Sequence, residues 1–185
     1  MNEHNSNASG PGVTGVGDTH ARFRVYMGNR PDYDLGTSGV QPLQQGDITR
    51  IGQACGNGWR KVFNVYAKLL YSLPAEFGFR QNSHSWQQYR DQYLLQKGSQ
   101  TALMFSPTEL SQSHCLHLLM GRTFARSVLC EEEVTWLNRE FALDSRRCRI
   151  ICPYFDYRQL SNQKILFLGD LIQELMKRHR LLLED

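Results

Sequence analysis

Four short segments with strand-like patterns, separated by helical patterns, constrain the fold of this chain more than any other feature. They occupy residues 21–28, 101–105, 115–120 and 148–154. The last three are largely continuous apolar runs, which are typical of strands buried on both faces of a parallel sheet. Strands that alternate with helices form layered domains. We therefore predict an α/β three-layer sandwich with a mainly parallel four-stranded sheet.

The first of these segments differs from the others because apolar and polar side chains alternate along it. Its two faces hold Phe23, Val25 and Met27 on one side and Arg22, Arg24 and Tyr26 on the other. Such alternation is typical of a strand with only one buried face. We therefore expect this strand at an edge of the sheet or with one face exposed.

Apolar residues at three- and four-residue spacing predict helices between and after the strands. These helices cover residues 47–55, 57–73, 84–95, 121–129, 131–143 and 162–178. Three glutamates begin the segment 131–143, where a helix dipole favours acidic residues. Ser161 is a suitable N-cap for the last helix.

The length of 185 residues suits one domain with a sizeable core. Residues 1–20 are rich in Asn, Gly and Ser, and we predict that they form a flexible N-terminal tail. Residues 21–185 are then predicted to form a single α/β domain. A long loop from residue 29 to residue 46 contains several glycines, and loops of this length are usually functional or disordered.

Composition and cysteine content argue against several classes of protein. No apolar run approaches the ~20 residues that span a bilayer, and the chain begins without a secretory signal pattern. We therefore expect a cytoplasmic protein without a membrane partner. The five cysteines are odd in number, and Cys148 and Cys152 lack the second pair that a zinc site requires. We expect no disulfide framework, no metal and no cofactor.

Neither the net charge nor the placement of the histidines indicates a particular ligand or reaction. The net charge of +3 is too small to indicate nucleic-acid binding by itself. His114 and His117 lie three residues apart around a predicted strand, so they are expected to face opposite sides rather than share a metal. A histidine inside a buried run, as His117 is, is typical of a core residue with satisfied hydrogen bonds.

Ligands of parallel sheets bind outside the carboxyl ends of the strands, so the loops after the four strands form the candidate site. These loops contain the candidate ligand-binding residues Asn29, Arg30, Asp32, Asp34, Phe105, Arg122, Asp156, Tyr157 and Arg158. Tyr157 beside Arg158 suits stacking on exposed bases. Backbone N–H groups at the turn before Arg122 suit a phosphate.

The two aspartates of the first loop are open to two interpretations. Asp32 and Asp34 near Arg30 could activate water as a general base. Aspartates in this setting also hydrogen-bond their own backbone in a turn. Asn29 is likewise either a group that points into the site or a turn residue after Gly28.

Five segments, in one order, resemble the uracil-DNA glycosylase superfamily. They are "RVYMGNRPDYDLG", "GWRKVFNVYAKLL", "TALMFSP", "HLLMGRTFARSV" and "IICPYFDYRQLSNQ". The resemblance implies that superfamily's three-layer fold and a ligand cleft at the strand ends. It does not extend to the chemistry: Arg30 stands where the family has its water-activating acid, and Phe105 stands where it has its pyrimidine-reading asparagine. The leaving-base histidine of the family has no counterpart, and we expect no iron–sulfur cluster.

The sequence therefore favours a degenerate glycosylase-like domain that binds a nucleic acid or a nucleotide-like anion and does not excise uracil. Two alternatives remain open. One is a small-molecule hydrolase or transferase that uses Asp32 or Asp34 together with Asp156. The other is a protein-interaction module in which the cleft is vestigial. The sequence does not predict the oligomeric state.

Overall fold

A computed structural model describes residues 13–36 and 38–182 of the chain. The strands are β1 (Val13–Gly17), β2 (Phe23–Tyr26), β3 (Gly39–Gln41), β4 (Thr101–Met104), β5 (Leu116–Met120), β6 (Thr135–Trp136), β7 (Ala142–Asp144) and β8 (Arg149–Cys152). The α-helices are α1 (Asp47–Cys55), α2 (Asn57–Ser72), α3 (Trp86–Gln92), α4 (Arg122–Val128) and α5 (Asn162–Arg178). Short 3-10 helices cover Ala75–Phe77 and Glu131–Glu133.

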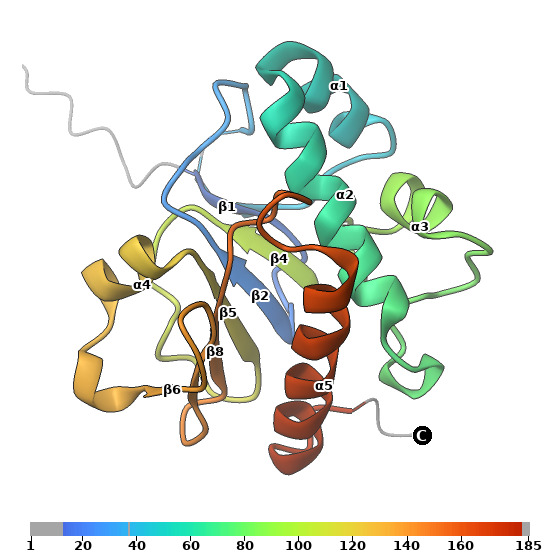
Figure 1. The fold of residues 1–185 in the computed structure, drawn as a ribbon. Coiled ribbons are helices and arrows are strands. Elements are labelled where there is room, and N and C mark those ends of the chain that lie inside the picture. Colours follow the sequence, from blue (N-terminus) through green and yellow to red (C-terminus); the bar gives the residue numbers. More distant parts are fainter. Residues whose placement is uncertain (1–12, 37, 183–185) are drawn as a thin grey trace, which may run out of the picture.

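All eight strands of the described residues belong to one mixed sheet, in the order β3-β1-β4-β2-β5-β8-β7-β6 (Figure 1). Its centre, β4-β2-β5-β8, is parallel and consists of the four strands that the sequence predicts. The α/β class is therefore confirmed, whereas the expected four-stranded sheet is wrong. Three of the additional strands have only two or three residues, and β1 contains two glycines, so periodicity alone gives a weak signal for them.

Strand β2 lies at the centre of the sheet, between β4 and β5, so the expectation of an edge or half-exposed strand is wrong. Its polar face is buried as deeply as its apolar face: Arg24 is 3% exposed and Tyr26 is fully buried. Polar residues tolerate burial when their hydrogen bonds are satisfied. The alternation in β2 therefore separates an apolar face from a polar but equally buried one.

The predicted flexible tail, residues 1–20, is wrong for its second part, because residues 13–17 form a strand of the sheet. Strand β1 pairs with β3 on one side and with β4 on the other, and Val16 is only 1% exposed. The Asp18 carboxylate accepts hydrogen bonds from the backbone N–H groups of His20 and Gln100, which fastens the end of β1 to the start of β4. Residues 1–12 of the predicted tail lie outside the described residues.

The helix predicted over residues 131–143 is also wrong, because this segment folds into the antiparallel β6–β7 hairpin, which continues the sheet beyond β8. The Asn138 side chain accepts hydrogen bonds from the backbone N–H groups of Glu140 and Phe141, at 2.8 and 2.9 Å, and closes the turn. Val134 and Thr135 are β-branched and favour extended backbone. The glutamates form only a 3-10 turn before the hairpin.

Helices cover both faces of the sheet, as a layered fold requires (Figure 1). Helices α2 and α5, with α1 and α3 beside α2, pack on the face that carries Phe23, Val25 and Met27. Helix α4 packs on the other face against β5 and β8, near Tyr26. The last helix begins and ends as predicted, and the Ser161 hydroxyl caps it by accepting a hydrogen bond from the Lys164 backbone N–H.

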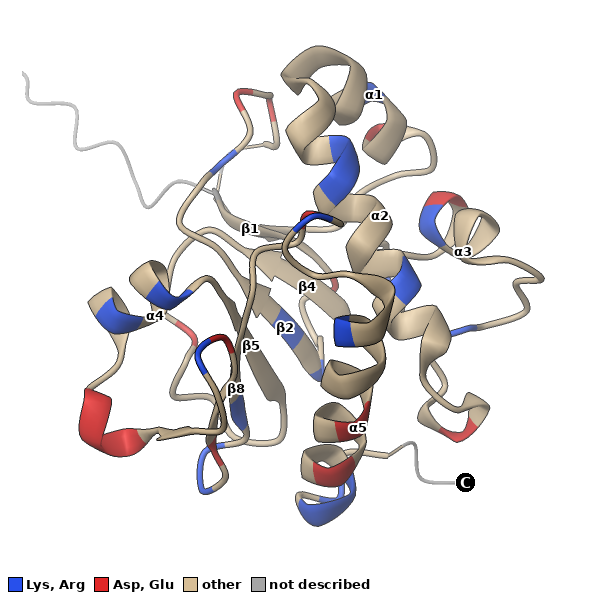
Figure 2. Cartoon of the chain, in the orientation of Figure 1, with Lys and Arg blue, Asp and Glu red and all other residues tan. Residues whose placement is uncertain are grey.

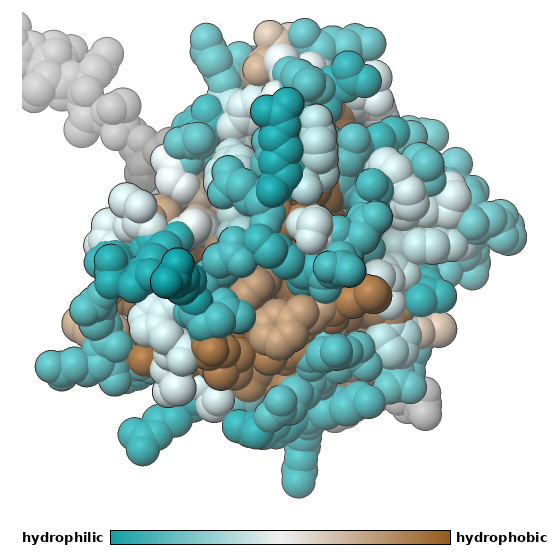
Figure 3. All heavy atoms as spheres, viewed as in Figure 1, coloured by the Kyte–Doolittle hydropathy of each residue, from teal (hydrophilic) through white to brown (hydrophobic). Residues whose placement is uncertain are grey.

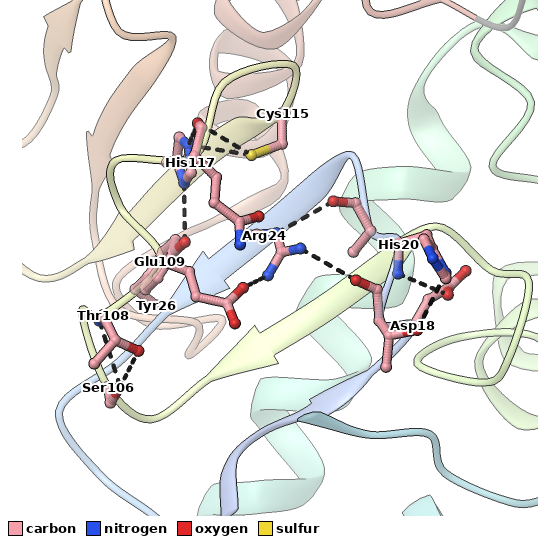
Figure 4. Close-up of polar contacts among 12 residues, drawn as sticks. Asp18, His20, Arg24, Tyr26, Ser106, Thr108, Glu109, Cys115 and His117 are labelled. Carbon is pink, nitrogen blue, oxygen red and sulfur yellow. Dashed lines mark hydrogen bonds and ion pairs between the residues drawn. The ribbon is translucent and has the colours of Figure 1, made fainter. Parts of the chain in front are cut away.

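A row of buried polar side chains crosses the centre of the face that α4 covers. Arg24 of β2 is in register with His117 of β5, and His117 is in register with Arg149 of β8. Each holds the segment from Pro107 to Cys115: Arg24 pairs with the Glu109 carboxylate (Figure 4), and His117 and Arg149 contact backbone carbonyls. We call these three side chains the buried polar row. They hold an irregular segment over the sheet where a helix would otherwise lie.

Gly17 tests whether β1 is part of the folded sheet. Its φ is +128°, and an added Cβ would lie 2.3 Å from the Thr101 carbonyl oxygen and 2.6 Å from the Ala102 Cα atom. We expect Gly17→Ala to lower the free energy of unfolding by roughly 3 kcal/mol or more, because backbone strain and a clash with β4 combine. Urea denaturation measures this change.

Gly39 supplies the matched control for this substitution. It also has a positive φ, of +67°, but an added Cβ would meet nothing within 4 Å. Gly39→Ala is expected to cost only the backbone strain, about 1 kcal/mol. Equal, small effects of the two substitutions would show that β1 does not pack against β4 in solution.

Candidate functional site

The topology places the candidate site at the carboxyl ends of β2 and β5. After β2 the chain forms β3 at the edge of the sheet, and it then adds β4 on one side of β2 and β5 on the other side. Loops that leave β2 and β5 therefore diverge, and open α/β sheets bind ligands at such a point. Gly28 follows β2 and lies beside α4, since an added Cβ would be 3.4 Å from the Phe124 ring.

The strongest grouping of predicted residues lies in the loop after β8. Lys61 of α2 places its Nζ 3.0 Å from the Asp156 carboxylate and 4.8 Å from the centroid of the Tyr157 ring. The Arg158 guanidinium lies 5.9 Å from the same ring. The ring itself is 55% exposed. We call Lys61, Asp156, Tyr157 and Arg158 the Tyr157 platform; it is an exposed aromatic residue with two cations near its ring.

The carboxylate of the platform is held in its ionised form. Asp156 accepts a hydrogen bond from the Arg158 backbone N–H at 2.9 Å and another from the Lys61 ammonium. These bonds, the backbone one first, lower the pKa of Asp156. A carboxylate with a lowered pKa is a weak base, so its contacts suit the positioning of Lys61 and Arg158 better than proton abstraction.

Asn29 links the first loop to the last. Its side chain hydrogen-bonds the Tyr154 hydroxyl, and this bond opposes the effect of burial, which raises the pKa of Tyr154. Asn29 therefore lies across the end of the sheet rather than only closing its own turn. This contact joins the loop after β2 to the loop that carries the Tyr157 platform.

The two aspartates of the first loop make different contacts: Asp34 bonds within its own turn, and the Asp32 backbone contacts the end of α1. The Asp34 carboxylate accepts a hydrogen bond from the Gly36 backbone N–H at 3.1 Å, which is the turn that the sequence offers as one interpretation. The Asp32 carbonyl accepts a bond from the Cys55 thiol at the end of α1. Both carboxylates and Arg30 are exposed. The Asp34 contact favours the turn interpretation for that residue, whereas the Asp32 contact involves only its backbone.

Phe105 and Arg122 are engaged elsewhere. Phe105 is partly buried and packs edge-to-face against Trp59 of α2, with ring centroids 6.2 Å apart. The Arg122 guanidinium lies 4.4 Å from the centroid of the Trp136 ring in β6 and donates to the Arg139 carbonyl. Arg122 therefore faces the β6–β7 hairpin, and Phe105 contributes packing beneath the site.

Sequence reasoning missed Lys61, which completes the contacts at this end of the sheet. Tyr154 belongs to the aromatic run with Phe155 and Tyr157 that the sequence places beside Arg158, but nothing in the sequence predicts its contact with Asn29. Lys61 had a signal: Arg60 and Lys61 lie near the N-terminus of α2, where the helix dipole disfavours cations. Figure 2 shows basic residues in α2, in the loop before α5, in α4 and in the loop after β2.

A cysteine and a histidine meet in the buried polar row without forming a catalytic pair. The Cys115 sulfur lies 3.2 Å from His117 Nε2, and Tyr26 hydrogen-bonds the other ring nitrogen at 2.9 Å (Figure 4). The Gln112 carbonyl, 2.9 Å from Nε2, can only accept, so Nε2 carries the proton and cannot take one from the thiol. Burial lowers the pKa of His117 to about 4 and raises that of Cys115. The pair is therefore structural.

Metal ligands and disulfides do not contribute to this site. All five cysteines are free thiols. The part of the chain that the structure describes contains no group of three or more His, Cys, Asp or Glu side chains able to hold a metal ion. Within the same ranges, no helix combines the length and apolar character that crossing a membrane requires.

Comparison with protein families gives a match over most of the chain. The family described as "Family of unknown function (DUF6942)" matches residues 14–173 of the chain. No curated protein and no solved structure matches it. The match begins within β1 and ends within α5, so it covers the whole sheet except the first residue of β1.

The Lys61–Asp156 pair gives a direct test of the Tyr157 platform. In Lys61→Gln the pKa of Asp156 is expected to rise, because the ammonium that stabilises the carboxylate is lost, while the Arg158 N–H bond keeps the pKa below its ordinary value. NMR titration of the Asp156 carboxyl carbon measures this shift. Because folding lowers the pKa of Asp156, this carboxylate adds stability at pH values above its ordinary pKa and loses that contribution as the pH falls through its lowered pKa. Any difference in the free energy of unfolding between the wild type and Lys61→Gln should therefore vanish in acid, where Asp156 is protonated.

Lys68→Gln is the matched control for this substitution. Lys68 lies on the same helix, but its Nζ contacts the Trp86 ring, 4.9 Å away, instead of Asp156. The Lys68→Gln substitution should leave the titration of Asp156 unchanged. A pKa of Asp156 that responds to neither substitution would disprove the ion pair in solution.

Proposed function

We propose that this chain, which belongs to the DUF6942 family, binds a nucleic acid or a nucleotide-like ligand at the carboxyl ends of β2, β5 and β8. The observation that carries the proposal is the Tyr157 platform, in which the cations of Lys61 and Arg158 lie near the exposed Tyr157 ring. Single-stranded nucleic acids are held in this way, by aromatic stacking and by charge.

Each part of the platform has a role in such binding. The Tyr157 ring offers its face to a base, and base stacking contributes about 1–3 kcal/mol without selecting a particular base. Lys61 and Arg158 offer charged donors to phosphate oxygens, the arginine in a two-point geometry. Arg30, exposed at the end of β2, adds a cation from the opposite loop. The proposed ligand therefore carries at least one base and one phosphate.

We propose binding without glycosylase chemistry. Arg30 stands at the position of the glycosylase acid, and Phe105, at the position of the base-reading asparagine, is packed against Trp59. A glycosylase-like fold remains part of the proposal: four adjacent parallel strands support it, although the sheet as a whole has eight strands and is mixed. The hydrolase alternative is less favoured, because Asp34 bonds within its own turn and Asp156 is held ionised by Lys61 and Arg158.

Fluorescence anisotropy with a labelled single-stranded oligodeoxynucleotide tests this proposal. Tyr157→Ala and Arg158→Ala are each expected to weaken binding roughly tenfold, from the loss of one stacked base or one phosphate contact. The thermal midpoint should stay unchanged because both side chains are exposed. Binding should also weaken as salt concentration rises. A uracil-containing oligonucleotide should bind without release of uracil.

Arg178→Ala is the matched control, since it removes one exposed arginine of α5 that pairs with Glu174, far along the helix from the platform. It should leave the affinity unchanged. Binding that is equally strong in all three variants, or absent in the wild type, would contradict the proposal.

A second candidate, a protein-interaction module, is favoured by a different surface. Leu137 in the turn of the β6–β7 hairpin and Leu166 and Phe167 of α5 are 45%, 63% and 39% exposed. Phe167 also packs edge-to-face against Phe141, which brings α5 and the hairpin together. Figure 3 shows hydrophobic atoms gathered between these elements. Exposed apolar groups that cluster in this way are typical of contact surfaces.

The interaction candidate has its own test. If this surface mediates self-association, light scattering should show a mass above the 21.4 kDa of the single chain, and Leu166→Glu should return it to that mass. The exposed Leu166 contributes little to the core, so the fold should tolerate the change. A wild-type protein that is monomeric at high concentration would exclude self-association through this surface.

A further inference from the structure

A cavity lies at the opposite, amino-terminal ends of β5 and β8. It has a volume of about 380 Å³ and is bordered by the segment Leu110–Cys115, by Arg146–Arg149 and by the end of α5. Enclosed sites for small ligands begin at roughly this size. The cavity is separate from the Tyr157 platform, because the two are at opposite ends of the same parallel strands.

The lining of this cavity is basic. It includes the arginines Arg146, Arg147 and Arg149 and the histidines His114 and His179, and none of the described residues that line it is acidic. Hydroxyl donors come from Ser111 and Ser113. Such a lining favours an anion, because guanidinium groups and hydroxyls donate hydrogen bonds to its oxygens.

Two carboxylates behind the cavity position the arginines and leave an excess of positive charge. Glu133 and Asp144 each contact Arg147 at 3.2 Å, and they lie 3.4 and 3.7 Å from Arg149. Arg146 forms no ion pair with any residue that the structure describes. Three guanidinium groups thus face two carboxylates, and Arg146 supplies the charge that is not neutralised.

Arg149 provides a separate indication of a ligand. It is only 8% exposed, and its two terminal nitrogens are occupied by Glu133, by Asp144 and by the Leu110 carbonyl. Its third nitrogen, Nε, is buried and has no hydrogen-bond acceptor among the described residues. Buried N–H groups are nearly always paired. Arg149 is among the residues that line the cavity, and a ligand reaches this Nε only when the guanidinium turns toward it, because the nitrogen has almost no accessible surface.

A second hollow, of about 470 Å³, lies on the other side of the same segment and shares Leu110, Ser111 and Arg149 with the cavity. The segment between them is held to the sheet by the buried polar row. Arg149 therefore lies beneath both hollows, and the backbone that covers it is fixed by Arg24 and His117. This arrangement keeps the cavity formed before any ligand arrives.

We propose that this cavity binds the phosphate group of a small phosphorylated metabolite. The lining comes from three separate segments, so a phosphate, which has more acceptor oxygens than a carboxylate, can use donors from more than one of them. The exposed Arg146 and Arg147 hold the phosphate at the entrance, and the buried Arg149 lies beneath it. The cavity is larger than a phosphate ion, so it also receives part of the organic body beside Leu110 and Leu181.

Isothermal titration calorimetry of the full chain with a pentose 5-phosphate, and with the same pentose lacking phosphate, tests the proposal. The phosphorylated sugar is expected to bind and the free sugar is not. Arg146→Gln should weaken binding about tenfold, the effect of one lost charged hydrogen bond. Because Arg146 is exposed, the variant should fold as the wild type does, which its thermal midpoint verifies.

Two control variants distinguish this site from non-specific attraction and from the Tyr157 platform. Arg139→Gln removes an exposed arginine of the hairpin turn, outside the cavity, and should leave the affinity unchanged. Lys61→Gln should also leave it unchanged, whatever it does to oligonucleotide binding. No saturable binding of the sugar phosphate, or an equal loss in Arg146→Gln and Arg139→Gln, would overturn the proposal.

Discussion

The pairing of the buried polar row with the segment above it is the constraint on which the rest of the structure depends. Arg24, His117 and Arg149 lie in register on three neighbouring parallel strands, and all are nearly or fully buried. A buried charge that loses its partner costs about 3–5 kcal/mol, so Glu109 and the backbone carbonyls of the segment must remain in place. The row therefore determines where an irregular segment covers the sheet.

This constraint separates the two ends of the parallel strands. At the amino-terminal ends, the fixed segment borders a basic cavity whose deepest arginine retains an unsatisfied N–H group. At the carboxyl-terminal ends, the loops diverge, and an exposed ring has two cations nearby. Both ends favour anions, but one is a hollow of limited volume and the other an open surface. A small metabolite suits the first and an extended ligand suits the second.

The sequence predicted part of the candidate site. The loop with Asp156, Tyr157 and Arg158 follows a recognisable apolar strand, and strand ends are where α/β domains bind ligands. Lys61 was missed because its helix was interpreted only as a core element. The basic cavity was missed because Arg146–Arg149 lies before a strand, and its partners, His114 and His179, come from segments distant in the sequence. Only the pairing of β5 with β8 brings these residues together.

The sequence by itself determined the α/β class, the four central strands and the limits of α5, because apolar periodicity and capping residues act over a few neighbouring positions. Tertiary structure decided the rest. Strand β1 forms only because β3 and β4 provide edges on both sides, and the β6–β7 hairpin replaces a helix because β8 offers a free edge. The polar face of β2 is buried because Arg24 pairs with Glu109, which lies 85 residues away in the chain but adjacent in space. Such pairings depend on contacts between distant segments, which local periodicity does not encode.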